Sequence, residues 1–119
     1  MLEFQNVSFQ YDAEDFDIVD GLSFRVEPGE FVSIIGPSGC GKSTIFRLVN
    51  KLLPRKAGNI LVNGHSIDKR RGYCGYMPQR DLLFPWRTVA DNLRLPMEIQ
   101  GGVSKGEMDK RIAGTLDVV

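Results

Sequence analysis

The sequence predicts an α/β fold built around a phosphate-binding loop, and three neighbouring segments predict it. Residues 36–44 read Gly-Pro-Ser-Gly-Cys-Gly-Lys-Ser-Thr and satisfy the pattern G-x-x-x-x-G-K-[ST] in full. The apolar run Phe31–Ile35 precedes the loop and predicts a central strand covered on both faces. After the loop, apolar residues recur at helical spacing: Ile45, Leu48, Val49 and Leu52. A strand, a glycine-rich turn and a helix in this order are typical of proteins that bind a nucleoside triphosphate.

Each part of the loop has a predicted task. We expect the glycines at 36, 39 and 41 to take positive φ and to let the backbone approach an anion. Lys42 would bring its charge to the β and γ phosphates, and Ser43 would offer its hydroxyl to Mg²⁺. Thr44 is expected to contact a second phosphate or the start of the helix. The residues assigned to nucleotide binding in this loop are Gly36, Pro37, Ser38, Gly39, Cys40, Gly41, Lys42, Ser43 and Thr44.

Composition bounds the remaining possibilities. The 119 residues leave room for one domain at most, and 42% hydrophobic content suits a globular chain. Lys plus Arg and Asp plus Glu each count 15, so no net charge favours nucleic acid as a partner. The two cysteines have no metal-site spacing, which, with no signal sequence, predicts a reducing compartment. No run approaches the ~20 apolar residues that span a bilayer, so any membrane role is expected to come through a partner.

The N-terminal stretch alternates as strands do. Val7, Phe9 and Tyr11 share one face of the first segment, and Leu22 and Phe24 share one face of the second. This predicts an antiparallel pair with one face in water.

Turn and cap signals divide the rest of the chain. The helix after the loop is expected to end near Leu53, before Pro54. Asn59–Val62 predicts a strand, closed by a hairpin turn at Asn63-Gly64. Gly72–Tyr76 is a further candidate strand.

Two helices are predicted in the C-terminal third. Thr88 is expected to cap a short helix that runs through Leu95 and is broken by Pro96. Ser104 and Glu107 form a capping box. Apolar residues then follow on one helical face: Met108, Ile112, Leu116 and Val119.

The order of these pieces resembles the N-terminal half of the ATP-binding subunit of an ABC transporter. The resemblance rests on Pro28–Phe31, Ile35–Thr44, Tyr76-Met-Pro-Gln79, Leu82–Val89 and Asp91-Asn92. It implies a P-loop NTPase fold of the ABC type. Residues 1–85 would form the antiparallel β subdomain and part of the mixed or parallel core sheet, and residues 86–119 the start of the helical subdomain.

The resemblance also implies roles outside the loop. Gln79 falls at the Q-loop glutamine, which helps bind Mg²⁺ or the attacking water and relays nucleotide state to the membrane subunit. Lys42 and Gln79 are therefore the catalytic candidates, Ser43 and Gln79 the metal ligands, and Mg²⁺ and ATP the cofactors. Tyr11 matches the aromatic residue that stacks on adenine; taken alone, it would as readily pack against another strand.

Further implied partners are a transmembrane permease, a second ATP-binding subunit and, indirectly, a solute-binding protein. Residues 85–89, Pro-Trp-Arg-Thr-Val, are similar to bacterial importers of nitrate, taurine and aliphatic sulfonates. Leu82–Arg87 would lie in a groove that receives a permease helix, although Trp86 could instead anchor a core cluster. The location implied is the cytoplasmic face of the bacterial inner membrane, peripheral through the permease.

Several parts of such an ATPase are not found in this sequence. They are the Leu-Ser-Gly-Gly-Gln-like signature, the second acidic strand with its Asp and Glu, and the switch histidine; His65 lies too early and reads as an exposed turn residue. We therefore expect these 119 residues not to hydrolyse ATP alone and to be marginally stable. Two alternatives stay open: a non-catalytic nucleotide-binding module, and an unrelated P-loop kinase or GTPase.

Overall fold

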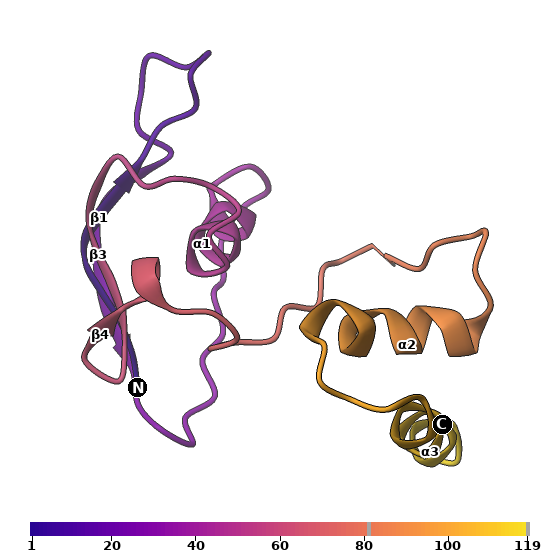
Figure 1. The fold of residues 1–119 in the computed structure, drawn as a ribbon. Helices are drawn as coiled ribbons and strands as arrows, with labels where there is room; N and C mark the ends of the chain where they lie inside the picture. The colour runs from indigo at the N-terminus through magenta and orange to yellow at the C-terminus, as the bar shows by residue number, and fades with distance from the viewer. Residues whose placement is uncertain (81, 119) are drawn as a thin grey trace. The chain divides into compact units, whose positions relative to one another are not determined.

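The computed structural model describes residues 1–80 and 82–118. The chain divides into two compact units, Met1–Met77 and Pro78–Val119, and each is described by itself. The first unit contains a β-sheet with a helix and a short 3₁₀ turn, and the second contains two helices (Figure 1).

The sheet of the first unit has four strands in the order β2-β1-β3-β4, and every neighbouring pair is antiparallel. The strands are β1 (Leu2–Phe9), β2 (Val19–Val26), β3 (Ala57–Val62) and β4 (His65–Ser66). The antiparallel pair predicted from the alternation is confirmed. Phe4 of β1 lies opposite Phe24 of β2, and their rings stack at 4.5 Å between centroids.

A bulge at Asn6 interrupts the alternation of β1. Asn6 has a φ of 48°, and the pairing of β1 with both β2 and β3 shifts register beside it. The extra residue shifts by one position the alternation of side chains between the two faces of the strand. Phe4 and Val7, three residues apart, are therefore both buried on the same side.

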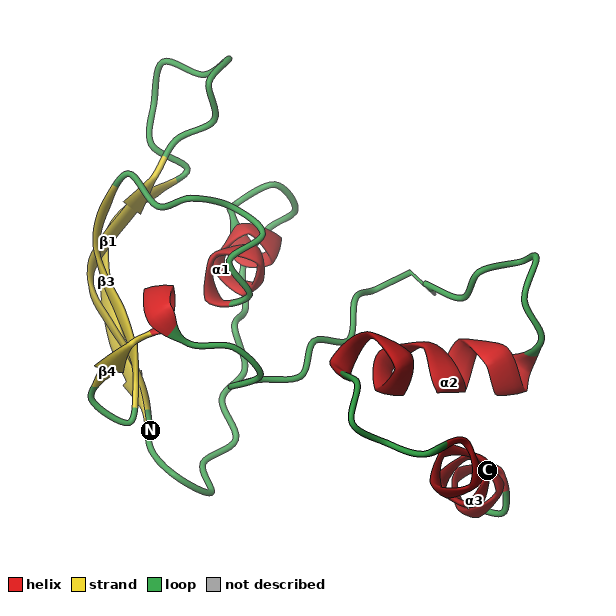
Figure 2. Ribbon diagram, viewed as in Figure 1, coloured by secondary structure: helices red, strands yellow, loops and turns green. Residues whose placement is uncertain are grey.

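The helix α1 (Lys42–Val49) and the 3₁₀ turn η1 (Ile67–Lys69) cover one face of the sheet (Figure 2). Leu48 of α1 and Ile67 of η1 are 2% and 0% exposed, because they fill the space against the strands. The buried cluster comprises Phe4, Val7, Phe9, Val19, Leu48, Ile60 and Ile67.

The predicted end of α1 near Leu53 is wrong, because the helix ends earlier at Val49. Lys51 has a φ of 55°; its N–H donates to the Leu48 carbonyl at 3.1 Å, and the Leu52 N–H donates to the Arg47 carbonyl at 2.9 Å. These two bonds form the C-terminal cap that a left-handed residue makes. Leu52, predicted on the apolar face, is 60% exposed.

The predicted hairpin at Asn63-Gly64 is confirmed. Asn63 and Gly64 have φ of 51° and 75° and join β3 to β4. Two consecutive positive φ values are those of the tight turn that Asn-Gly favours.

Two predicted strands do not form. Phe31–Ile35 has no regular secondary structure, and Phe31 and Ile35 are each 92% exposed. A β-strand is stabilised by backbone hydrogen bonds to a neighbouring strand. None of the four strands of the sheet pairs with Phe31–Ile35. Gly72–Tyr76 is also irregular. Its Tyr73 hydroxyl donates instead to the Val49 carbonyl at 2.5 Å, beside the end of α1.

The second unit contains α2 (Val89–Gln100) and α3 (Lys105–Leu116). Both predicted caps are confirmed: the Thr88 hydroxyl accepts from the Asp91 N–H at 3.1 Å, and that of Ser104 accepts from the Glu107 N–H at 3.4 Å. The predicted break at Pro96 is wrong, because α2 continues through it. Proline removes the donor to the carbonyl four residues earlier and its ring crowds that carbonyl. The last turn nevertheless closes, with the Gly101 N–H on the Met97 carbonyl at 3.0 Å.

The apolar face predicted for α3 is formed in part. Met108 and Ile112 are buried, whereas Leu116 is 42% exposed and Val119 lies outside the described residues. Within residues 1–80 and 82–118, no helix is long and apolar enough to cross a membrane.

Candidate nucleotide-binding site

The glycines of residues 36–44 shape the loop in two different ways. Gly39 and Gly41 have φ of 83° and 89°, and Gly41 is the residue that caps α1. Positive φ at Gly36 was also predicted, and this is wrong. Gly36 matters for space instead: a Cβ there would lie 2.7 Å from the Cys40 Sγ. The loop therefore needs glycine for conformation at 39 and 41 and for close packing at 36.

The start of α1 presents backbone donors next to the loop. Thr44 and Ile45 both donate their N–H to the Gly41 carbonyl, at 3.0 and 3.2 Å. The N–H groups of Lys42 and Ser43 precede these two. The first amides of a helix have no acceptor within the helix. These amides and the aligned peptide dipoles make the N-terminus of α1 favourable for an anion.

The Lys42 ammonium is held against the loop. Its Nζ donates to the carbonyl oxygens of Gly36 at 2.7 Å and Pro37 at 2.5 Å, and lies 3.5 Å from the Cys40 Sγ. The cationic group therefore lies beside the same loop whose backbone would receive phosphate. Cys40 itself is a free, exposed thiol.

Ser43 and Thr44 face different surroundings. Ser43 is exposed, so its hydroxyl is available as an oxygen ligand. Thr44 is 5% exposed, and its Oγ1 lies 3.5 Å from the Tyr11 hydroxyl. Mg²⁺ takes oxygen ligands and usually keeps waters and phosphate oxygens, so the Ser43 hydroxyl fits one position of such a site. Within the described residues, His, Cys, Asp and Glu form no group of three or more that could hold a metal.

Tyr11 lies two residues after the end of β1, and its side chain is held from two sides. The ring meets that of Phe9 edge to face, with 4.7 Å between centroids and 88° between planes. The hydroxyl lies 3.5 Å from the Thr44 Oγ1 and accepts from the Arg47 Nη1 at 3.4 Å. The structure therefore brings Tyr11 to the same helix that begins at the loop.

The acidic stretch after Tyr11 is tied to the end of the sheet. The Glu14 N–H donates to the Tyr11 carbonyl at 3.0 Å. Lys56 donates to the carboxylate of Asp17 at 2.7 Å and to the Gln10 side chain at 3.0 Å. These contacts fix the path of the chain between β1 and β2.

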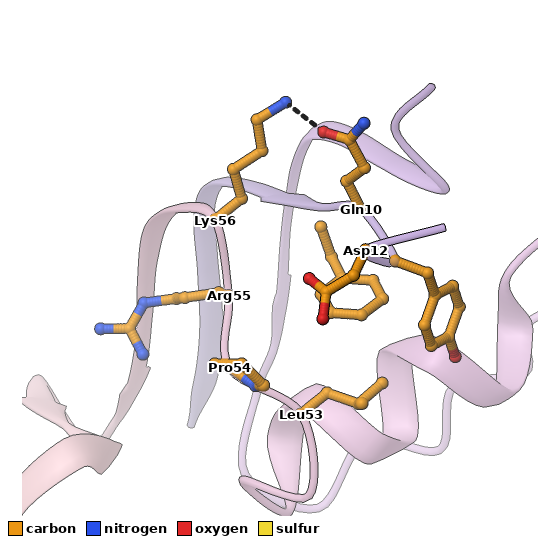
Figure 3. Close-up of a pocket in the computed structure, with 8 residues that line it drawn as sticks. Gln10, Asp12, Leu53, Pro54, Arg55 and Lys56 are labelled. Atoms are coloured by element: carbon orange, nitrogen blue, oxygen red, sulfur yellow. Dashed lines mark hydrogen bonds between the residues drawn. The ribbon is translucent and has the colours of Figure 1, made fainter. Parts of the chain in front are cut away.

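A groove of about 520 Å³ lies beside Tyr11 (Figure 3). Its lining residues are Phe9, Gln10, Tyr11, Asp12, Leu53, Pro54, Arg55 and Lys56. Sequence reasoning did not find this groove, because its walls come from segments more than forty residues apart. It also missed Arg47, although a position three residues after Thr44 shares a helical face with it.

Gln79, the candidate catalytic and metal residue outside the loop, is exposed in the second unit. The neighbouring residues Leu82, Leu83, Phe84 and Trp86 are 72%, 62%, 38% and 76% exposed. The centroids of the Phe84 and Trp86 rings lie 5.0 Å apart. The Phe84 backbone N–H donates to the Asn92 Oδ1 at 2.8 Å. Trp86 is thus no part of a buried core in the residues that the structure describes.

The remaining polar residues singled out by sequence take ordinary places. His65 is exposed at the start of β4, as expected for a turn residue. Lys69 and Arg71 are exposed, whereas the Arg70 guanidinium donates to the Val62 carbonyl at 2.7 Å.

The fold and the loop together define an α/β protein of the phosphate-loop class. A family model described as "ABC transporter" matches residues 19–119. The chain belongs to this family, and the predicted fold class is confirmed.

Relatives of known function support the same family. The formylaminopyrimidine import ATP-binding protein ThiZ of Halalkalibacterium halodurans is 44% identical over 101 residues, which are 85% of this chain and 38% of that protein. The methionine import ATP-binding protein MetN 2 of Pseudomonas entomophila is 36% identical over 98% of this chain and 38% of its own length. The aliphatic sulfonates import ATP-binding protein SsuB of Bacillus cereus is 34% identical over 77% of this chain and 37% of its own. The chain therefore spans less than two fifths of the length of these relatives.

A solved structure shares the fold. The dimeric post-hydrolysis state of an ATP-binding cassette bound to ADP and Pi superposes with a TM-score of 0.80 at 26% identity, covering 98% of this chain and 56% of that one. The aligned region thus includes residues of both units. The relatives import three different solutes, so the predicted nitrate, taurine and sulfonate subfamily stays a prediction.

Proposed function

We propose that this chain is the ATP-binding part of an ABC importer subunit that couples ATP binding and hydrolysis to solute uptake. The single observation that carries the proposal is the glycine-shaped loop at the start of α1, with the Lys42 ammonium held at its carbonyls. A polyphosphate is the ligand that such a loop receives best, because backbone N–H groups, the helix dipole and a lysine all favour negative charge.

Each residue of the loop has a task in this function. The backbone of residues 36–44 would bind the phosphates, and Lys42 would leave the loop carbonyls to pair with the β and γ oxygens. Thr44 would contact phosphate at the helix start. The ring of Tyr11 would provide a flat surface for adenine, a stacking contact of roughly 1–3 kcal/mol.

The metal site is proposed from the chemistry of its donors. Mg²⁺, when bound, would neutralise part of the charge of the phosphates. Ser43 would hold it through its hydroxyl, and Gln79 through its side-chain amide oxygen. Gln79 would also report the state of the nucleotide to the membrane subunit.

The exposed apolar side chains of the second unit support a permease as one partner. We propose that Leu82–Arg87 receives a short helix of a transmembrane permease, because an apolar surface that includes Trp86 is typical of interface anchors. A second ATP-binding subunit would complete the nucleotide sites, and a solute-binding protein would act indirectly. The protein would then work at the cytoplasmic face of a bacterial inner membrane, peripheral through its permease.

Two finer parts of the proposal concern extent and solute. Residues 1–85 would be the β subdomain and loop core of one ATP-binding domain, and residues 86–119 the start of its helical subdomain. The solute class we propose is a small oxyanion or sulfonate, on the resemblance of residues 85–89.

Titration calorimetry with Mg-ATP tests the proposal. Lys42→Ala should lower the affinity about tenfold to a hundredfold, because a hydrogen bond from a charged group contributes about 1.5–3 kcal/mol. Lys69→Ala is the matched control, since that lysine is exposed and lies outside the loop. An unchanged affinity in Lys42→Ala would contradict the assignment of the loop.

An ATPase assay tests the coupling to hydrolysis. The chain alone is expected to be inactive, and mixing with an intact cassette and permease should change turnover. Binding of ATP with no effect on an intact partner would favour the non-catalytic module.

A further inference from the structure

We propose that Arg47 is a positioning residue of the nucleotide site, acting by holding the Tyr11 ring through its hydroxyl. The proposal rests on the proposed function, since it assigns a task to Arg47 in the binding of ATP. The sequence analysis did not single out this arginine, which lies in the last turn of α1.

The contacts of Tyr11 show why its hydroxyl needs a partner. The Tyr11 ring is restrained by an edge-to-face contact with the Phe9 ring, with 4.7 Å between the two centroids. Its far end reaches α1, where, among the residues that the structure describes, the hydroxyl contacts Thr44 Oγ1 at 3.5 Å and Arg47 Nη1 at 3.4 Å. The position of the Tyr11 ring is therefore set by α1 as well as by Phe9 of the sheet.

The chemistry of the three groups gives the contact a direction. A guanidinium only donates, so the Tyr11 oxygen must accept from Arg47. Between Tyr11 and Thr44 either hydroxyl can donate, because each has one O–H and the Tyr11 oxygen keeps a second lone pair. A chain of bonds thus runs from Arg47 through Tyr11 to Thr44 at the start of α1.

Burial determines which member of this chain can be replaced. Thr44 is 5% exposed, so substitutions there would disturb packing. Arg47 is exposed and Tyr11 is half-buried, so Arg47→Met and Tyr11→Phe remove the contact while keeping the bulk of each side chain. Tyr11→Phe also keeps the stacking ring, which separates the hydroxyl from the aromatic surface.

The experiment compares two ligands, Mg-ATP and Mg-tripolyphosphate, by titration calorimetry on the full chain. Arg47→Met and Tyr11→Phe should each weaken Mg-ATP about threefold to tenfold, the effect of one hydrogen bond. The double variant should lose no more than either single one, because both remove the same contact. Affinity for Mg-tripolyphosphate should stay unchanged, and Arg47→Lys should recover part of the ATP affinity.

The possible results distinguish a failure of the role of Arg47 from a failure of the proposed ATP-binding function. Unchanged Mg-ATP affinity in Arg47→Met would overturn the role of Arg47. An equal loss for both ligands would also overturn it, since Arg47 would then act by charge on the phosphates. Wild-type chain that binds neither ligand would overturn the proposed function itself. Circular dichroism and thermal melting of each variant control for loss of fold.

Discussion

Arg55 holds both carboxylate oxygens of Asp68: its Nη1 lies 2.7 Å from Oδ1 and its Nη2 lies 2.5 Å from Oδ2. The same guanidinium donates from Nε to the Gly58 carbonyl at 2.7 Å. Arg55 therefore connects three segments of the first unit: the chain after α1, the start of β3, and η1. Planar two-point contacts of this kind add geometric specificity to the attraction between the charges.

The Arg55–Asp68 pair predicts a loss of stability in acid. Hydrogen bonds from Arg55, with a further one from Ser66, lower the pKa of Asp68 from its ordinary 3.8 to about 2. The folded state thus binds this proton less readily than the unfolded state, so the contribution is complete above about pH 4 and disappears as the pH falls through about 2. Because the Asp68 side chain is 49% exposed, solvent screens the pair and we expect less than about 1 kcal/mol.

Urea denaturation of the wild type and of Asp68→Asn from pH 6 to pH 2 checks this prediction. The wild type should be more stable near neutral pH, and the two curves should converge toward pH 2. A constant difference across the whole range would show that the carboxylate charge contributes nothing.

Gly58→Ala should be strongly destabilising. Gly58 has a φ of 82°, and an added Cβ would overlap the backbone carbonyl of Asn6 at the bulge of β1. Both effects act together, so we expect a loss of about 2 kcal/mol or more in the free energy of unfolding.

Gly64→Ala is the matched control for that prediction. Its φ of 75° is similar, but a Cβ there would meet nothing within 4 Å. The cost should be only the conformational one, about 1 kcal/mol. Equal losses in the two variants, measured by thermal unfolding, would refute the role of the close approach to Asn6.

Arg94 should be important for the pairing of α2 with α3. It donates to the Asp91 carboxylate at 2.7 Å and to that of Asp109 at 2.9 Å, so one side chain joins the two helices. Arg94→Met should increase amide hydrogen exchange in α3 (Lys105–Leu116) while leaving the sheet of the first unit unchanged. Arg111→Met is the control, because within the described part of the chain Arg111 forms its ion pair with Glu107 of its own helix.

Trp86→Ala should leave both stability and ATP affinity nearly unchanged. The side chain is 76% exposed, so its removal creates no cavity, and surface substitutions usually change stability by less than about 0.5 kcal/mol. If the proposed permease contact is right, stimulation of turnover by the permease should fall in a complete transporter that carries this change. A melting temperature lowered by several degrees would instead identify Trp86 as a packing residue.

Local signals in the sequence were sufficient for much of this structure. The caps Thr88 and Ser104 and the turn at Asn63-Gly64 formed as predicted, and so did the positive φ at Gly39 and Gly41 of the loop, though not at Gly36. Each depends on residues close together in the chain. The turns need a residue that adopts a positive φ, and the caps need a hydroxyl that accepts a hydrogen bond from an amide three residues later. Such interactions are present in the sequence itself, whatever the rest of the chain does.

Tertiary contacts decided the remainder. Phe31–Ile35 has the composition of a buried strand, yet it makes no ladder, because a strand depends on a neighbour that composition does not specify. Pro96 lies inside α2, because a helix can lose one hydrogen bond when its neighbouring turns are intact. The meeting of Tyr11 with Arg47 joins positions 36 residues apart. The sequence thus determined the glycine turns of the phosphate loop, the start of α2 and α3 and the Asn63-Gly64 turn, because these depend on neighbouring residues. Only the packing of distant segments decided which apolar runs pair and what holds Tyr11.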